Sequence, residues 1–228
     1  MRLMRLMRLM SPCIAVVGLI VIVLVIMETR PRNTHAMIEL FGGDERLFLV
    51  GDSTLNNSNY VAIENTVASI TKKTHSKTIL GAEDNAEILW VNEQLTTASP
   101  TKHDTVCLSV GGNDLLNAYR GGDLTNKTFL NKAKDSYEKL LNYIHKKYTK
   151  RVLLCDLYYP ADPSFAKYQP IIKSWNAFLR EMGGKYKCTI ISISSVVTDD
   201  NHFTDKIEPS ESGSALISSA ILKQRVVD

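Results

Sequence analysis

The chain has 228 residues, of which 44% are apolar and 22% are charged, and these are ordinary values for a globular protein. Its length suffices for one domain with a sizeable core plus a short appendage. The composition excludes a mostly disordered chain, a collagen-like repeat and a membrane protein with many spans.

The formal net charge of +3 comes from the N-terminal part of the chain. Up to residue 32 there are five arginines and one glutamate, which leaves 22 basic and 23 acidic residues in the rest. A near-neutral remainder lacks the basic excess that binds a phosphate backbone. We therefore expect no nucleic-acid partner.

The first 44 residues differ in character from the rest. Residues 1–9 are a basic low-complexity repeat of Met-Arg-Leu, and residues 10–27 include an uninterrupted apolar run from Cys13 to Met27. Eighteen helical residues span roughly 27 Å, close to the ~30 Å of bilayer hydrocarbon. We predict a single-pass signal anchor over 10–27 and a tether over 28–44, with the following domain lumenal or extracellular. A cleaved signal peptide, which would leave a secreted protein, and a buried helix are the alternatives.

Five short apolar runs in the remaining chain predict β-strands that are covered on both faces, because hydrophobic residues do not alternate with polar ones. These runs are Leu47–Val50, Lys77–Leu80, Thr105–Val110, Val152–Leu157 and Cys188–Ile193.

Helical patterns lie between and after these strands. Residues 129–144 carry apolar side chains at helical spacing, Pro170 predicts the start of a helix that ends at Gly183 and Gly184, and Ser210 predicts the N-cap of a final helix. Alternation of strand and helix predicts an α/β domain over residues 45–228. It would be a three-layer α/β/α sandwich around a five-stranded, mostly parallel, doubly wound sheet, with no second domain.

Three cysteines, Cys107, Cys155 and Cys188, fall in or at the start of predicted strands, which indicates buried free thiols rather than a disulfide framework. No histidines and cysteines lie at metal-ligand spacing, and the chain contains no nucleotide-binding glycine motif. We expect neither a metal nor a cofactor.

Polar segments follow the predicted strands, and in a doubly wound sheet ligands bind beyond the carboxyl ends of the strands. Each segment by itself is compatible with an ordinary turn. Together they place serine, asparagine, aspartate and histidine at one edge, which indicates a catalytic site. The segments are Gly51–Thr54, Gly81–Asn85, Gly111–Asp114, Tyr158–Pro160 and Asp199–His202.

This set of residue types suits acyl transfer to a serine. Ser53, in a tight turn after the first strand, is the candidate nucleophile, and His202 is the candidate base that takes its proton. Asp199 is close enough along the chain to orient the imidazole. The backbone N–H groups of Ser53 and Gly81 and the side chain of Asn113 are candidate donors to the oxyanion.

The same segments resemble the sequence blocks of the SGNH (GDSL-type) hydrolase superfamily, over residues 47–221. The matching blocks are Gly51-Asp52-Ser53, Thr78–Ala82, Gly111-Gly112-Asn113-Asp114 and Asp199-Asp200-Asn201-His202. The resemblance implies a flavodoxin-like SGNH fold and ester hydrolysis through an acyl-enzyme. It also implies that Ser53 is the nucleophile, His202 the base and Asp199 its partner, with Ser53, Gly81 and Asn113 forming the oxyanion hole.

The chain departs from the family pattern at two positions. Thr54 follows the nucleophile where the family often has Leu or Ile, and Phe203 follows the histidine where the family often has Pro. In addition, Asp200 adjoins Asp199, so either carboxylate is a candidate to orient His202, and the spacing favours Asp199.

The sequence thus predicts a membrane-tethered serine esterase that cleaves a lipid ester or an acylated carbohydrate. Tyr158 and Tyr159 are candidates to line its substrate pocket, although a packing role suits them equally. An acyltransferase with the same site and a non-catalytic binding domain that keeps the fold are the alternatives.

Overall fold

The structure is a computed structural model, and it describes residues 45–120 and 127–224. The predicted N-terminal repeat (1–9), anchor (10–27) and tether (28–44) lie outside these ranges. Among the described residues, no helix has the length and apolar character that crossing a membrane requires.

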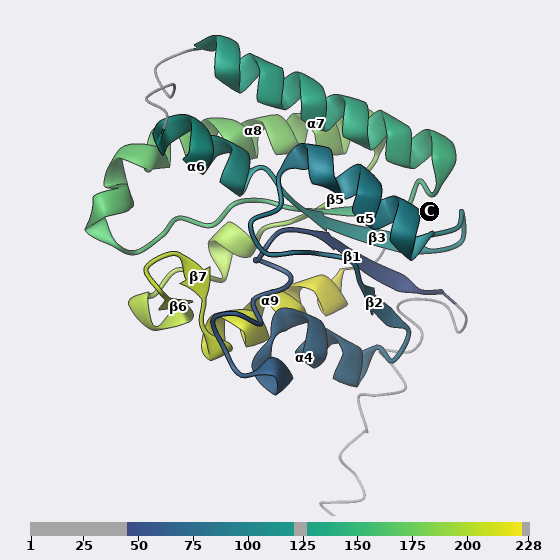
Figure 1. Ribbon diagram of the computed structural model, residues 1–228, viewed down its shortest axis with the longest axis horizontal. Coiled ribbons are helices and arrows are strands. Elements are labelled where there is room, and N and C mark those ends of the chain that lie inside the picture. Colours follow the sequence, from purple (N-terminus) through teal and green to yellow (C-terminus); the bar gives the residue numbers. More distant parts are fainter. Residues whose placement is uncertain (1–44, 121–126, 225–228) are drawn as a thin grey trace, which may run out of the picture. The chain divides into compact units, whose positions relative to one another are not determined.

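A five-stranded parallel sheet in the order β2-β1-β3-β4-β5 forms the centre of the domain (Figure 1). The strands are β1 (Leu47–Gly51), β2 (Thr78–Leu80), β3 (Thr105–Ser109), β4 (Val152–Cys155) and β5 (Thr189–Ile191). The predicted α/β class, strand number and parallel order are confirmed, although four of the strands begin or end one or two residues inside their predicted limits. Because β1 pairs with β3 up to Gly51 and Ser109, the carboxyl ends of these strands lie side by side.

Helices cover both faces of the sheet, as the predicted sandwich requires. Helices α4 and α9 lie on one face, and α5, α7 and α8 lie on the other (Figure 1). The helices are α4 (Val67–Thr74), α5 (Val91–Ala98), α6 (Gly112–Arg120), α7 (Lys127–Lys147), α8 (Gln169–Tyr186) and α9 (Glu211–Lys223). Short 3-10 helices cover Ile63–Asn65, Ile88–Trp90, Pro163–Tyr168, Ile193–Ser195 and Asp200–His202.

Strand β1 shows why its sequence is a continuous apolar run. Leu47 and Leu49 pack into the core beneath α4 and α9, while Phe48 and Val50 pack into the core that includes Trp175 of α8. All four side chains are fully buried. Alternate side chains point to opposite faces of a sheet, so a strand that is covered twice needs apolar residues at every position.

The helix boundaries confirm one prediction and correct another. Ser210 is the N-cap of α9, and its hydroxyl accepts a hydrogen bond from the Gly213 N–H (3.2 Å). The expected stop of α8 at Gly183 and Gly184 is wrong, because the helix continues to Tyr186. A Cβ at Gly183 would lie 2.8 Å from Ile190 Cδ1, so this glycine lets α8 approach β5 rather than ending it.

A two-stranded antiparallel hairpin that the sequence patterns did not predict precedes α9. It pairs β6 (Phe203–Thr204) with β7 (Glu208–Pro209), and Asp205 and Lys206 at its tip have positive φ angles of 42° and 71°. In Figure 1 this hairpin lies beside the loops at one end of the sheet.

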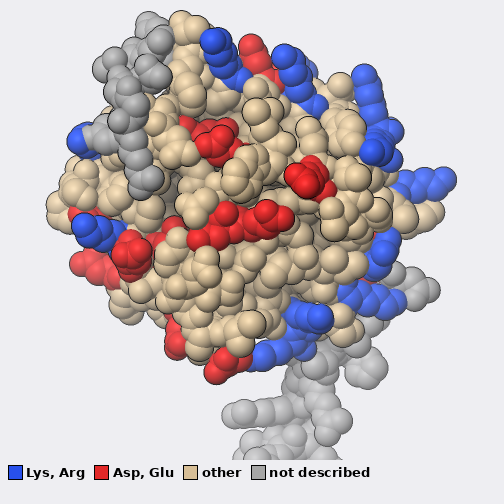
Figure 2. Space-filling view, viewed as in Figure 1, with Lys and Arg blue, Asp and Glu red and all other residues tan. Residues whose placement is uncertain are grey.

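Charge is unevenly distributed over the visible face. Figure 2 shows acidic side chains gathered across the middle of this face, while lysines and arginines lie along the side where α5 and α7 are seen in Figure 1.

Candidate active site

The turn that carries Ser53 depends on the backbone of Gly51, the last residue of β1. Gly51 has a φ of 125°, and its N–H and carbonyl are both held by the buried Gln94 amide at 2.7 and 2.9 Å. The next N–H, that of Asp52, bonds to the Ser109 carbonyl on β3 (2.9 Å). The chain therefore leaves the sheet sharply, with Ser53 directly above the ends of β1 and β3.

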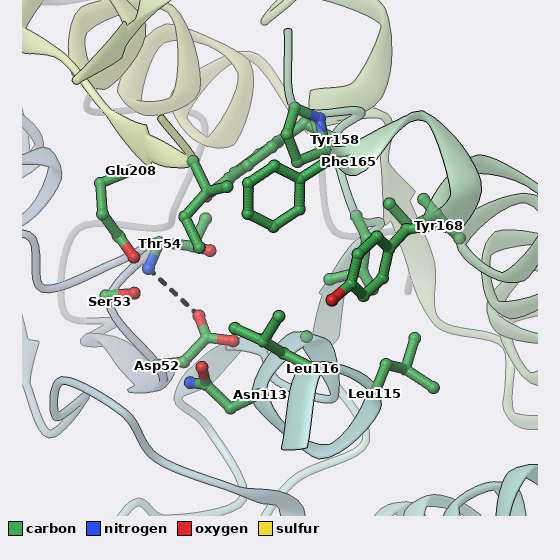
Figure 3. A pocket seen from close by; sticks show the side chains of 15 residues that line it. Asp52, Ser53, Thr54, Asn113, Leu115, Leu116, Tyr158, Phe165, Tyr168 and Glu208 are labelled. Atoms are coloured by element: carbon green, nitrogen blue, oxygen red, sulfur yellow. Dashed lines mark hydrogen bonds between the residues drawn. The ribbon is translucent and has the colours of Figure 1, made fainter. Parts of the chain in front are cut away.

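The buried Asp52 carboxylate stabilises this turn. It accepts hydrogen bonds from the Thr54 N–H (3.1 Å, dashed in Figure 3) and from the Ser109 hydroxyl (3.2 Å). Burial raises the pKa of Asp52 to about 7, and the hydrogen bonds from Thr54 and Ser109 oppose that rise. These contacts hold the residues on both sides of Ser53 in place.

Asn113 approaches Ser53 from the first turn of α6, after the end of β3. Its Nδ2 donates to the Ala86 carbonyl (3.1 Å), and the neighbouring Asp114 accepts from the Ile88 N–H (3.1 Å). Burial raises the pKa of Asp114 to about 6. The loop after β2 is thus bound to α6, and the Asn113 amide is held at the carboxyl edge of the sheet.

A cavity of about 90 Å³ opens beside Ser53 (Figure 3). Asp52, Ser53, Asn113 and Glu208 form its polar end. The rest is mostly apolar and is lined by Leu115, Leu116, Leu157, Pro160, Phe165, Tyr168, Ile172 and Ile207. A hydroxyl at the end of an apolar pocket suits a substrate whose reacting carbonyl carries an apolar chain.

Three of the predicted site residues, Ser53, Asn113 and Tyr158, line this cavity. Burial raises the pKa of the Tyr158 hydroxyl well above its usual value, and its ring packs edge-to-face on Phe203 at 5.5 Å. Tyr159 packs instead against the core that lies under α7 and α8. Gly81 does not line the cavity either, and its N–H donates to the Leu49 carbonyl on β1 (2.8 Å).

The structure places His202 beside Asp199 but not in the wall of the cavity. Its Nδ1 accepts hydrogen bonds from the N–H groups of Thr198 (3.1 Å) and Asp199 (3.2 Å). Its Nε2 lies 3.9 Å from Asp199 Oδ2, and the Asp199 side chain is 74% exposed. The predicted His202–Asp199 pair therefore forms, but the structure does not bring it together with Ser53.

Glu208, on β7, is the site residue that sequence reasoning missed. Its side chain is buried in the cavity wall, and Figure 3 shows its carboxylate directed toward Ser53. Burial raises the pKa of Glu208 to about 7, and the hydroxyl of Ser53 opposes that rise. The sequence contained a pattern that could have identified Glu208. Asp205 precedes it by three residues and Pro209 follows it, and the SGNH sequence blocks have an aspartate and a proline at these same positions around their histidine.

Among the described residues, no group of three or more histidine, cysteine, aspartate or glutamate side chains is placed to hold a metal ion.

Comparison with known proteins identifies the fold. No protein-family model and no curated protein sequence matches this chain. Solved structures do match this chain. A member of the lipolytic G-D-S-L family from Veillonella parvula has a TM-score of 0.64 at 14% identity, and the match covers 78% of this chain and 97% of the chain in that structure. An acetyl xylan esterase from Geobacillus stearothermophilus has a TM-score of 0.60 at 12% identity, covering 81% and 97%. A lipase/acylhydrolase from Enterococcus faecalis has a TM-score of 0.59 at 16% identity, covering 78% and 94%. The SGNH fold that the sequence blocks implied is confirmed.

Proposed function

We propose that this protein is an SGNH-type serine ester hydrolase with Ser53 as its nucleophile. The observation that carries the proposal is the position of the Ser53 hydroxyl at the polar end of a mostly apolar cavity, next to the Asn113 amide and a carboxylate. Structures with the same fold include lipolytic proteins and acetyl xylan esterases, which supports ester chemistry for this chain.

The reaction would follow two steps. Ser53 Oγ attacks the ester carbonyl as a base removes its proton, and the tetrahedral oxyanion takes hydrogen bonds from the Ser53 N–H and the Asn113 side chain. The alcohol then leaves, and water attacks the acyl-enzyme. The motifs assign the base to His202, its orientation to Asp199 and a third oxyanion donor to Gly81, and these roles stay predictions.

The cavity favours a neutral ester with an apolar acyl group. Apolar side chains line the part farthest from Ser53, and the carboxyl groups of Asp52 and Glu208 lie at its polar end (Figure 3). An anionic acyl group would be repelled there. Lipid esters and acylated carbohydrates both satisfy these conditions.

Labelling with a fluorophosphonate probe tests the nucleophile. We expect the full-length protein to react with the probe at Ser53, as located by mass spectrometry, and to hydrolyse p-nitrophenyl butyrate. Ser53→Ala removes the attacking oxygen and should abolish both signals. Ser58→Ala, which alters an exposed hydroxyl in the same loop, is the matched control and should keep both. A folded wild-type protein without probe labelling and without Ser53-dependent turnover contradicts the proposal.

We further propose that residues 10–27 tether the enzyme to a membrane. The support is the apolar run and its length, as described for the sequence. A full-length protein with a C-terminal tag is expected to stay in the membrane pellet after alkaline carbonate washing, with its N-terminal segment intact. Recovery in the supernatant of a protein that begins after residue 27 would instead establish a cleaved signal.

A further inference from the structure

We propose that Glu208, rather than His202, is the general base that accepts the Ser53 proton. This inference rests on the hydrolase function proposed above and changes the identity of one catalytic residue. It is carried by the position of the Glu208 carboxylate relative to the nucleophile and by the hydrogen bonds already made by His202.

Glu208 and Ser53 meet inside the cavity wall. Both residues are less than 10% exposed, and both line the cavity. Figure 3 shows the carboxylate pointing at the Ser53 hydroxyl. Its Oε2 is buried and has no hydrogen-bond partner among the described residues, so this oxygen is available to a substrate, a water or a transferred proton. A general base must be able to approach the proton it removes, and the Glu208 carboxylate points at the hydroxyl that carries this proton (Figure 3).

His202 has no acceptor nitrogen to offer in this arrangement. The lone pair of Nδ1 accepts from two backbone N–H groups, so the hydrogen of the neutral ring is on Nε2. An Nε2 that carries a hydrogen can donate but cannot take a proton from a serine. Its Nε2 lies 3.9 Å from the exposed carboxylate of Asp199, and neither residue lines the cavity. His202 also has a backbone role, since its carbonyl accepts from the Ser210 N–H (2.9 Å) at the start of α9.

The fold holds Glu208 in place through the buried side chain of Asn57. Asn57 lies on the loop that follows Ser53, and its Nδ2 donates to the Pro209 carbonyl (3.0 Å) and to the Ser214 hydroxyl (2.6 Å). Its Oδ1 accepts from the Val67 N–H at the start of α4 (3.2 Å). Asn57 thus connects the nucleophile loop with the residue that follows Glu208. Pairing of Thr204 with Glu208 in the hairpin adds a second constraint on the carboxylate.

The Glu208 carboxylate by itself can accept and return every proton that the two steps transfer. Ionised Glu208 takes the hydroxyl proton as Ser53 Oγ bonds to the acyl carbon, and the resulting carboxylic acid gives that proton to the departing alkoxide as the ester C–O bond breaks. In the second step Glu208 takes a proton from water, the new hydroxide oxygen bonds to the acyl carbon, and the proton returns to Ser53 as the acyl bond breaks. Both steps leave Glu208 ionised, as it began.

Neighbouring groups suit Glu208 to this role near neutral pH. Burial raises its pKa most, and the carboxyl groups of Asp52, Asp84 and Asp205 raise it further, while Ser53 lowers it. Burial and this carboxylate together raise the pKa of the Tyr60 and Tyr158 hydroxyls. A carboxyl with a pKa of about 7 binds protons strongly enough to act as a base at physiological pH. Because the ionised form is the active one, kcat/KM should rise with pH through about 7.

The test compares Glu208→Gln, Glu208→His and His202→Gln in the full-length protein, with p-nitrophenyl butyrate as substrate. Glu208→Gln keeps the size of the side chain but cannot accept a proton, so kcat/KM should fall roughly 10²–10⁴-fold. Glu208→His supplies another base at the same place and should recover roughly tenfold or more of that loss. Glu211→Gln, which removes a neighbouring exposed carboxylate, is the matched control and should keep the wild-type rate and pH profile.

Folding is checked independently by melting at pH 8. The raised pKa of Glu208 means that the folded state holds a proton that the unfolded state loses at lower pH, so ionising this group destabilises the fold as pH rises through about 7. Glu208→Gln should therefore melt no lower than wild type at pH 8 while losing activity.

The outcomes separate this inference from the proposed function. If Ser53-dependent turnover is present and Glu208→Gln keeps it, while His202→Gln abolishes it, the inference is overturned and the hydrolase function stands. If Glu208→Gln loses turnover and Glu208→His does not regain any, the residue has another role and the inference is also overturned. If the wild-type protein has no Ser53-dependent turnover, both fail.

Discussion

Replacement of Gly51 by alanine is expected to destabilise the protein by roughly 3 kcal/mol or more and to lower the urea midpoint accordingly. The reason is steric. The φ of 125° lies in a region that side chains disfavour, and a Cβ at this position would lie 1.7 Å from the Ser109 carbonyl oxygen. That oxygen also accepts from Asp52, so it cannot move without disturbing the turn that carries Ser53.

A second glycine provides the control for this variant. Gly184 lies within α8, where a new Cβ meets nothing within 4 Å, so Gly184→Ala should be neutral or stabilising by up to about 1 kcal/mol. Equal urea midpoints for Gly51→Ala and wild type would contradict the steric argument. Activity that persists in a folded Gly51→Ala protein would show that the Ser53 turn tolerates another backbone geometry.

Replacement of Asn113 by alanine is expected to lower kcat for ester hydrolysis by roughly 10²–10³-fold with a smaller change in KM. One N–H of the Asn113 amide is bound to the Ala86 carbonyl, which holds the amide in the cavity wall beside Ser53. The amide's other N–H would then be the donor to the oxyanion. A donor that acts on the tetrahedral intermediate affects kcat more than substrate binding, so steady-state kinetics distinguishes this role from simple pocket lining.

Asn117 is the matched control for Asn113. It lies one turn further along α6, is exposed, and hydrogen-bonds with Glu87 rather than lining the cavity. Asn117→Ala should leave kcat unchanged. If both variants have wild-type kcat, Asn113 is not an oxyanion donor, and if both lose activity together with melting temperature, the effect comes from α6 as a whole.

Much of the fold could be predicted from local patterns. Leu47–Leu49 and the other apolar runs identified the strands, because a strand buried on both faces has no polar positions. Ser210 identified the start of α9 through its capping hydroxyl. Gly183 misled the prediction of where α8 ends, because its small size serves packing against Ile190 on β5 and not the end of the helix.

The candidate site also contains residues whose position the sequence predicts and residues whose orientation it does not predict. Ser53 and Asn113 could be predicted because each directly follows a strand of a parallel sheet, and such positions meet at one edge. Gly81 follows a strand as well, yet its N–H is used by β1. Position after a strand predicts where a residue lies along the sheet edge but not which way its N–H group points.

The sequence by itself determined the fold class and placed Ser53 and Asn113 at the edge of the sheet where the cavity lies, since these follow from apolar runs and from the residues that end them. Only the tertiary structure decided which group faces the nucleophile. His202 and Glu208 are six residues apart, and each is preceded at the same spacing by an aspartate, so local patterns treat them alike. The hairpin between them and the long-range hydrogen bond from Asn57 to Pro209 bring Glu208 against Ser53 and leave His202 beside Asp199. Contacts between residues about 150 positions apart in the chain have no signature in a local pattern, which is why this part of the site required the folded protein.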